Sequence, residues 1–594
     1  MEHIKTPKVE GVQLLQSSPG RPIPMGTMYL TATHIIFTSD TSRSDPNHSQ
    51  ETWLPHTQIA SVQRQPRYAV GFPLVIYCKT FRVLHLLIPH ESDCQDVMLS
   101  LTKLMQPGQY EDLYAFSYKA KASSAERQDG WNLINLRVEF GRIGMPSKHW
   151  QLTNINKNYQ VCETYPAKLY VPVGVSDITL LGSSRFRSRG RFPVLSYWHS
   201  DNGAAICRSS QPLAGFSARC LEDESLLEAI RQANPATGQK ALCVVDTRPK
   251  LNAIANRAAG KGYENEENYA NIRFRFLGIE NIHVMRNSLS KLLEVCQGKA
   301  LTAREFISGL AVSGWLRHIQ AIMQAATYIA KAVSDEGDSV LVHCSDGWDR
   351  TTQACALASL MLDPHYRTML GFMVLVEKEW LSFGHKFSHR CGFLEGDPRE
   401  VSPIFTQFLE CIWQLQLQFP CSFQYNEHFL LYLHELVYSC QFGNFLGNHV
   451  QEREALRLLE KTHTVWAHLW ERRGEFRNPL YNNKQNCNPT VLLPSTTAQC
   501  FRFWKGMYWP RSKRTTEDVL LDLSDKNQEL EKEISLLDKH LHKCVRDRHS
   551  AGGATRSEKN GDCSIYNSDQ ESGIADINQS SPNGNESDDK LPAL

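Results

Sequence analysis

The first hundred residues alternate between short apolar runs and turn residues. The runs "GTMYLTATHIIFTS", "HTQIASVQR" and "FPLVIYCKTFRVLHLLIP" are rich in β-branched and aromatic residues and predict strands. The next stretch, "ESDCQDVMLSLTKLM", predicts a closing amphipathic helix whose apolar positions are Val97, Leu99, Leu101 and Leu104. These elements predict a small β-barrel of pleckstrin-homology type over residues 1–106. Such barrels dock lipids, dock proteins or serve only as structure, and the local pattern does not choose among these roles.

The pattern changes after residue 106. Residues 107–125 are expected to link the barrel to a large domain over residues 126–510. In that domain, predicted strands and helices alternate without a low-complexity segment or a repeat. Such alternation is typical of an α/β fold.

A heptad pattern follows the large domain and predicts a coiled coil over residues 515–546. The a positions are Leu520, Asn527, Ile534 and Leu541, and the d positions are Leu523, Leu530, Leu537 and Cys544. An Asn at an a position favours a dimer, because it pairs with its counterpart and fixes the register. Homodimer and heterodimer both remain open, and the alternative is a helix that packs back on its own domain. The tail, residues 547–594, is rich in Ser, Asn, Gly and Asp and is expected to be disordered.

Composition narrows the class of protein. The 64 Lys and Arg residues balance the 63 Asp and Glu residues, which argues against a nucleic-acid binder with a general positive field. The 17 cysteines include no Cys-x-x-Cys pair, so no zinc ribbon is indicated and reduced cytosolic thiols fit best. Apolar stretches such as "MLGFMVLV" are far shorter than the roughly 18 residues of a membrane span, so membrane contact is expected to be peripheral.

The stretch "VLVHCSDGWDRTTQ" joins a predicted buried strand, "SVLVH", to a predicted apolar helix, "TTQACALASLML". The loop 344–350 therefore lies at a helix N-terminus, where backbone N–H groups and the helix dipole favour a phosphate group. The same field favours the thiolate of Cys344 and makes this residue the candidate nucleophile. The forked guanidinium of Arg350 suits the oxygens of a phosphoryl transition state.

Two further residues fit this reading of the loop. Gly347 permits a tight turn, and Thr351 is placed to donate a hydrogen bond to the thiolate. Among the 17 cysteines, only Cys344 has an Arg six positions later. The alternative is a buried structural Cys with a salt-bridging Arg, and the full spacing argues against it.

A cysteine phosphatase also needs a general acid, because an alkoxide is a poor leaving group. The chain has no Asp between Asp246 and Asp335, so the usual Trp-Pro-Asp acid upstream of the Cys is missing. Asp349, beside Arg350, is therefore the candidate acid. Asp346 is expected to shape the loop or to bind a substrate hydroxyl. For both carboxylates, the alternative is that they only accept hydrogen bonds from loop amides.

The stretch "VLVHCSDGWDRT" resembles the signature of the myotubularin lipid phosphatases. The resemblance extends to "GSSRFRSRGRFPVLSYWH", "CRSSQPLAGFSARCLEDE", "DTRPKLNAIANRAAGKGYEN", "GIENIHVMR" and "WLSFGHKFSHRCG". It is greatest for the subgroup of myotubularin-related proteins six, seven and eight. It implies a barrel of the GRAM type, a cysteine-phosphatase domain with the tyrosine-phosphatase-like α/β fold, and a C-terminal coiled coil, in that order.

The resemblance also implies an activity. Members of this family remove the 3-phosphate of phosphatidylinositol 3-phosphate and 3,5-bisphosphate through a phosphocysteine, on endosomal or autophagic membranes. The implied substrate contacts are Asn256, Asn281, Ile282, Ser345, Asp346, Gly347, Trp348, Lys386 and Arg390. The Asn side chains suit inositol hydroxyls, and Lys386 and Arg390, four residues apart, would share a helix face and grip a second phosphate. No metal or organic cofactor is expected.

Three functions compete at this point. Inactive family members lack the loop Cys or Arg, and this chain keeps both, which favours a lipid 3-phosphatase. Its expected partners are phosphoinositide membranes and a second myotubularin-related chain, itself active or inactive, and its expected location is the cytoplasm at endosomal membranes. The first alternative is a coiled-coil scaffold with secondary activity. The second is a phosphotyrosine phosphatase, against which the missing Trp-Pro-Asp argues.

Overall fold

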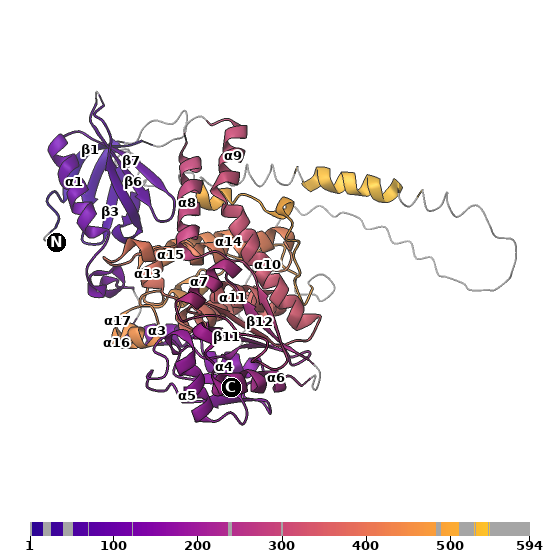
Figure 1. Cartoon of the computed structure of the whole chain (residues 1–594). Helices are drawn as coiled ribbons and strands as arrows, with labels where there is room; N and C mark the ends of the chain where they lie inside the picture. The colour runs from indigo at the N-terminus through magenta and orange to yellow at the C-terminus, as the bar shows by residue number, and fades with distance from the viewer. Residues whose placement is uncertain are drawn as a thin grey trace, which may run out of the picture. The chain divides into compact units, whose positions relative to one another are not determined.

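The structure is a computed structural model that describes residues 3–15, 25–39, 51–68, 70–120, 123–235, 240–298, 301–482, 489–509, 528, 530–543 and 546. The chain divides into two units, Met1–Lys513 and Arg514–Leu594. The first unit contains both the N-terminal sheet and the large α/β domain (Figure 1).

The N-terminal part is an antiparallel sheet of seven strands in the order β4-β3-β2-β1-β7-β6-β5. Its strands are β1 (Lys8–Leu15), β2 (Met25–Leu30), β3 (His34–Ser39), β4 (Glu51–Pro55), β5 (Ile59–Arg64), β6 (Phe72–Cys78) and β7 (Val83–Ile88). The two end strands, β4 and β5, are joined through the short turn His56–Gln58. The strands and the closing helix predicted from the alternating pattern are thus confirmed.

The closing helix is α1 (Glu91–Leu104), and it packs on this sheet through fully buried Cys94, Val97 and Leu101. These positions are spaced i, i+3 and i+7, as on one helix face. The prediction also placed Leu99 on this face, but Leu99 is exposed. Position 99 lies about 200° around the helix from Val97, which explains the difference.

The large domain is built on a five-stranded sheet in the order β10-β11-β14-β12-β13. The strands are β10 (Val194–Trp198), β11 (Ala205–Ser210), β12 (Leu242–Asp246), β13 (Ile272–Phe276) and β14 (Val340–Cys344). β10 runs antiparallel to β11 and the others are parallel. A separate pair is formed by β8 (Trp150–Thr153) and β9 (Leu169–Pro172). The buried run that was predicted to precede the phosphate loop is therefore the central strand, β14.

Helices cover this sheet (Figure 1). The helices of the first half are α2 (Tyr114–Ser117), α3 (Ser124–Asn132), α4 (Leu136–Arg142), α5 (Asp177–Phe186), α6 (Leu221–Gln232), α7 (Lys250–Ala258), α8 (Ile282–Gln297), α9 (Ala303–Ser313) and α10 (Trp315–Ser334). Those of the second half are α11 (Arg350–Leu362), α12 (Met369–Val376), α13 (Phe387–Cys391), α14 (Ile404–Gln418), α15 (Glu427–Ser439), α16 (Val450–Ala455), α17 (Leu458–Lys461), α18 (Val465–Glu471) and α19 (Lys505–Tyr508).

The helix α11 lies at the centre of the domain. All its residues are buried, and it packs against α10, α14 and β14. A helix that is buried all round must be apolar or small on every side, which the run "ACALASLML" satisfies. The loop 344–350 therefore leads into a helix that is buried on every side.

The predicted linker, residues 107–125, is partly built into the large domain. It contains a 3-10 turn at Tyr110–Asp112 and the short helix α2, and Leu113 and Ala115 belong to the core of the large domain. The apolar side chains of this short segment were too few to show a periodicity, so the sequence pattern gave no sign of it.

Residues 530–543 of the second unit are helical. The predicted seam residues Leu530, Ile534, Leu537 and Leu541 are all exposed on this helix. The other seam positions, Asn527 included, and the tail 547–594 lie outside the described residues. None of the helices that the structure describes is long and apolar enough to cross a membrane.

Candidate active site

The loop 344–350 joins the carboxyl end of β14 to the first turn of α11. Gly347 adopts a φ of 77°, and a Cβ at this position would lie 2.4 Å from the carbonyl oxygen of Ser209. Only glycine avoids both the strained left-handed backbone and this contact. The tight turn predicted for Gly347 is therefore present.

Cys344 and Arg350 stand at the two ends of this loop. The Cys344 side chain is buried, and its Sγ accepts a hydrogen bond from the backbone N–H of Gly347 at 3.2 Å. The Arg350 guanidinium donates to the carbonyl oxygen of Ile279 at 3.3 Å and to Ser345 Oγ at 3.2 Å. These weak contacts leave the guanidinium able to turn to a phosphate held above the loop.

Thr351 follows the loop, and its Oγ1 is buried without a hydrogen-bond partner among the described residues. A buried hydroxyl without a partner costs free energy unless a ligand or a thiolate supplies one. The predicted hydrogen bond from Thr351 to the Cys344 sulfur is not formed among the described residues. The hydroxyl has no other hydrogen-bond partner there that would compete with it.

Two buried arginines that the sequence analysis did not single out donate hydrogen bonds to the backbone of the loop. Arg191 donates to the carbonyl oxygen of Gly347 at 2.9 Å, and Arg208 donates to the same oxygen at 3.0 Å. Arg208 also donates to Thr352 Oγ1 at 2.6 Å and pairs with Glu379 at 2.8 Å. The carbonyl oxygen of Gly347 is thus held by two buried cations, which fixes the orientation of this peptide of the loop.

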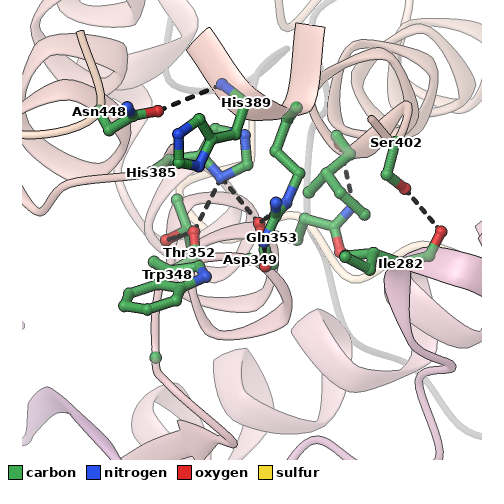
Figure 2. Close-up of polar contacts among 12 residues, drawn as sticks. Ile282, Trp348, Asp349, Thr352, Gln353, His385, His389, Ser402 and Asn448 are labelled. Atoms are coloured by element: carbon green, nitrogen blue, oxygen red, sulfur yellow. Dashed lines mark hydrogen bonds and ion pairs between the residues drawn. The ribbon is translucent and has the colours of Figure 1, made fainter. Parts of the chain in front are cut away.

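Asp349, the N-cap residue of α11 and the residue before Arg350, is buried between two basic side chains. Arg390 donates to Oδ1 from Nε at 3.0 Å and to Oδ2 from Nη2 at 2.9 Å. His385 Nδ1 lies 3.1 Å from Asp349 Oδ1 and 2.9 Å from the carbonyl oxygen of Trp348 (Figure 2). Burial alone would raise the pKa of Asp349, but Arg390 and His385 outweigh it and hold this pKa well below its usual range. The carboxyl group is therefore ionised in this state of the protein.

The other side chains of the loop have separate contacts. Asp346 Oδ1 accepts a hydrogen bond from Ser188 Oγ at 2.9 Å. Trp348 lies under Lys386, whose Nζ is 4.4 Å from the centre of the indole ring. Burial, with a smaller contribution from Arg390, lowers the pKa of Lys386.

The sequence analysis expected Lys386 and Arg390 to share a helix face, and the structure does not show this. Lys386 is the non-helical residue before α13, and Arg390 lies within α13. Arg390 is already paired with Asp349 and, at 2.7 Å, with Glu400. Of the two cations, Lys386 is thus the one without a carboxylate partner in the described residues.

Asn256, Asn281 and Ile282 come from helices beside the loop. Asn281 caps α8, where its Oδ1 accepts from the N–H groups of His283 and Val284, so its Nδ2 donors are left for a ligand. The carbonyl oxygen of Ile282 accepts from Ser402 Oγ at 2.8 Å (Figure 2). Asn256 is half-buried on α7.

A buried network also lies beside Cys344, the candidate nucleophile. His343 Nε2 lies 2.9 Å from Glu264 Oε2, and Arg187 pairs with Glu264 at 2.6 Å and with Asp223 at 2.7 Å. All four side chains are fully buried. Burial would raise the pKa of Glu264, but the charges of His343 and Arg187 hold it well below its usual range. The strand that carries Cys344 is thus anchored by a salt-bridge network.

The residues that the sequence did not single out, Arg191, Arg208, His385 and Glu264, act on the loop from segments far away in the chain. All four lie within stretches quoted for the family resemblance: "GSSRFRSRGRFPVLSYWH", "CRSSQPLAGFSARCLEDE", "DTRPKLNAIANRAAGKGYEN" and "WLSFGHKFSHRCG". A basic or His residue in an otherwise apolar stretch was the available signal. Its partner was not readable, because the contacts span more than 35 residues.

Comparison with known proteins agrees with this geometry. Residues 113–454 match the family model described as "Myotubularin-like phosphatase domain", and residues 8–105 match "MTMR6-9, GRAM domain". The chain belongs to the myotubularin phosphatase family. It is therefore a phosphoric monoester hydrolase with an N-terminal GRAM domain.

Three relatives show the extent of the similarity. "Phosphatidylinositol-3,5-bisphosphate 3-phosphatase MTMR8" of Gallus gallus is 56% identical over 550 residues, which cover 91% of this chain and 86% of that protein. "Phosphatidylinositol-3,5-bisphosphate 3-phosphatase MTMR6" of Homo sapiens is 55% identical over 547 residues, which cover 91% of this chain and 86% of that protein. "Phosphatidylinositol-3-phosphate phosphatase MTMR7" of Homo sapiens is 54% identical over 538 residues, which cover 89% of this chain and 81% of that protein. The expected subgroup of myotubularin-related proteins six, seven and eight is confirmed.

Proposed function

We propose that this myotubularin removes the 3-phosphate from phosphatidylinositol 3-phosphate and phosphatidylinositol 3,5-bisphosphate through a phosphocysteine. The observation that carries the proposal is the loop 344–350, which brings a buried thiol, a strand end, a helix N-terminus and a guanidinium to one point. The names of the relatives support 3-phosphorylated inositol lipids as the substrate class.

In the first step, the Cys344 thiolate forms a bond to phosphorus while the bond from phosphorus to the inositol oxygen breaks. Arg350 and the loop N–H groups bind the phosphoryl oxygens, whose charge increases in the transition state. In the second step, water attacks the phosphorus, the S–P bond breaks, and inorganic phosphate leaves. Thr351 donates a hydrogen bond to the departing thiolate.

Asp349 is proposed as the general acid that protonates the leaving oxygen. While Arg390 pairs with it, Asp349 is ionised and has no proton to give. The role therefore requires Arg390 to turn from Asp349 to the substrate, either to a second phosphate or to the phosphodiester at position 1. With that cation removed, the buried carboxyl takes up a proton, which it delivers to the inositol oxygen and recovers from the attacking water.

Lys386 is proposed to bind the second phosphate together with Arg390, and Asn256 and Asn281 to bind inositol hydroxyls. Asp346 stays paired with Ser188 and shapes the loop. The carbonyl of Ile282, the side chain of Trp348, and the backbones of Ser345 and Gly347 complete the wall of the site.

Phosphate release from both lipids and from a phosphotyrosine peptide tests this proposal, with the Cys344→Ser variant beside the wild type. Release from the 3-phosphorylated lipids alone, abolished by Cys344→Ser, is the expected result. A Cys500→Ser variant is the matched control, because Cys500 lies in a 3-10 turn near the end of the large domain and should leave the rate unchanged. Equal release from the peptide would favour the phosphotyrosine phosphatase, and no release from any substrate would favour the scaffold.

A dimer through the predicted coiled coil, at endosomal membranes in the cytoplasm, is part of the same proposal. The exposed Leu530, Ile534, Leu537 and Leu541 support it, since a helix in water gains by covering such a seam. Deletion after Trp509 should leave a monomer by light scattering. A dimer that survives the deletion would rule out the coiled coil as the dimer interface.

A further inference from the structure

The helix α7 presents its apolar side to the solvent. Leu251, Ile254, Ala255 and Ala258 follow the i, i+3, i+4, i+7 spacing of one helix face, and all four are exposed. Leu251 is 80% exposed, whereas Ala253 on the opposite face is fully buried. A surface helix of a soluble domain normally buries its apolar stripe, so this orientation is reversed.

A second apolar side chain projects beside this helix. Phe216, in the 3-10 turn Gly215–Ser217, is 87% exposed and has a φ of 56°, and Ser217 has a φ of 62°. A left-handed backbone is strained for a residue with a Cβ, and a bulky residue rarely adopts it. Phe216 makes almost no contact that offsets this cost in the isolated protein. Strain of this kind persists where the surrounding structure imposes it and where function uses it.

The left-handed backbone at Phe216 is imposed by the carboxyl end of α7. Gly215 is buried, and a Cβ there would lie 2.3 Å from Cα of Gly260 and 2.9 Å from the carbonyl oxygen of Arg257. The turn is therefore clamped against the carboxyl end of α7. Phe216 and the exposed stripe of α7 form one surface, which we call the apolar rim: Phe216, Leu251, Ile254, Ala255 and Ala258.

The segments that lead to the apolar rim are hydrogen-bonded to the loop 344–350 and to the strand residue just before it. The segment that leads to Phe216 contains Gln211, whose backbone N–H donates to the carbonyl oxygen of Ser345 at 3.1 Å. The segment that leads to α7 contains Thr247, whose backbone N–H donates to the carbonyl oxygen of His343 at 2.9 Å. The rim thus stands beside the loop 344–350, on the edge where β12 and β14 end.

Charge indicates what covers the rim. Residues 247–261 contain no acidic residue, and the cations among them that reach the surface are Lys250, Arg257 and Lys261. Arg248 is fully buried and pairs with Asp246, so it adds no charge to this surface. Lys250 and Arg257 are seven residues apart and therefore flank the apolar stripe on the same side. An exposed apolar stripe flanked by cations is typical of a helix that lies in the interface of an anionic membrane.

We propose that the apolar rim inserts into an anionic phosphoinositide-bearing bilayer and places the catalytic loop over the lipid headgroups. This inference rests on the proposed lipid substrate. Phe216 and Leu251 enter the acyl boundary, while Lys250 and Arg257 meet lipid phosphates. The left-handed turn holds Phe216 ready for insertion before the protein reaches the membrane.

Two substitutions test the rim without disturbing the core. Phe216→Asn suits the left-handed turn, so the melting temperature should stay the same or rise. Leu251→Gln keeps a good helix former at an exposed helix position. Each should lower the partition of the full-length protein onto phosphatidylserine vesicles containing phosphatidylinositol 3-phosphate by roughly tenfold, since burying one Leu or Phe side chain is worth at least that factor. Ile178→Gln is the control, because Ile178 is 75% exposed and, like Leu251, is the second residue of its helix.

Vesicle sedimentation is measured in a Cys344→Ser background, so that the lipid is not consumed. Phosphate release from a short-chain, water-soluble phosphatidylinositol 3-phosphate is measured for the same rim variants with Cys344 intact. Loss of vesicle binding with the soluble rate unchanged supports the rim. Unchanged vesicle binding overturns it, as does an equal loss with Ile178→Gln or a matching loss of the soluble rate. If the wild-type chain fails on the soluble lipid, the proposed function fails, and the sedimentation result still decides the rim.

Discussion

The ion pair between Asp349 and Arg390 gives the sharpest prediction about the site. Both side chains are buried and joined by two hydrogen bonds, at 3.0 and 2.9 Å. Asp349→Asn keeps the shape of the side chain but removes the charge that Arg390 faces. Breaking a buried pair by removing one partner costs about 3–5 kcal/mol, because the other charge stays buried. Arg390 retains Glu400, so we expect the lower end, about 3 kcal/mol.

Glu400→Gln is the matched control, because it removes the other carboxylate that faces Arg390. Its side chain is 44% exposed, so its ion pair is worth less than about 1 kcal/mol. Urea unfolding followed by tryptophan fluorescence compares the two variants with the wild type. Equal shifts for both variants would refute the reasoning, because they would show that burial does not distinguish the two ion pairs.

The pH dependence of the stability lost in Asp349→Asn checks whether the ion pair is the cause of that loss. The pKa of Asp349 lies below its value in the unfolded chain, so its stabilisation is complete above about pH 5 and is lost as the pH falls further. The difference in unfolding free energy between wild type and Asp349→Asn should therefore be equal at pH 5 and pH 8. A difference that disappears between these values would mean that Asp349 takes up a proton there.

The catalytic test of Asp349 follows from its two roles. If the carboxyl is both the acid and the partner of Arg390, Asp349→Asn loses most of its activity on phosphoinositides and a smaller part on an aryl phosphate, whose leaving group needs no proton. Equal losses on both substrates would indicate a structural role alone.

The remaining predictions concern the loop and a second buried carboxyl. Gly347→Ala should abolish phosphate release, because its Cβ would meet the Ser209 carbonyl oxygen, whereas Gly396→Ala, with no atom nearer than 4.0 Å, should retain it; an active Gly347→Ala would contradict the proposed loop geometry. Burial raises the pKa of Glu410 to about 7, although Tyr508 and Trp315 donate to its Oε2 at 2.5 and 2.7 Å and act against the rise. The folded state then holds a proton that the unfolded chain releases, so the unfolding free energy should fall by about 1.4 kcal/mol per pH unit between pH 5 and 7. Glu410→Gln should remove this slope in urea unfolding, and a slope unchanged by the substitution would assign it to another group.

Residues adjacent in the chain made much of the molecule predictable. The run "SVLVH", the helix "TTQACALASLML" and the loop between them follow from local patterns, because each depends on a period of a few residues. The N-terminal strands and α1 follow for the same reason. Cys344, Gly347 and Arg350 could be singled out as candidates from their spacing alone, since the chemistry of a phosphate loop lies within one short segment.

Only the tertiary structure decided what surrounds that segment. The buried support of Arg191 and Arg208, the ionised state of Asp349 and the pairing of Arg390 all join residues that are distant in the sequence. The outward apolar face of α7 is a further case, because the periodicity shows that a stripe exists and not which way it points. Local sequence fixes periods and loop chemistry within a few residues, whereas the partner of a buried charge depends on how the whole chain packs.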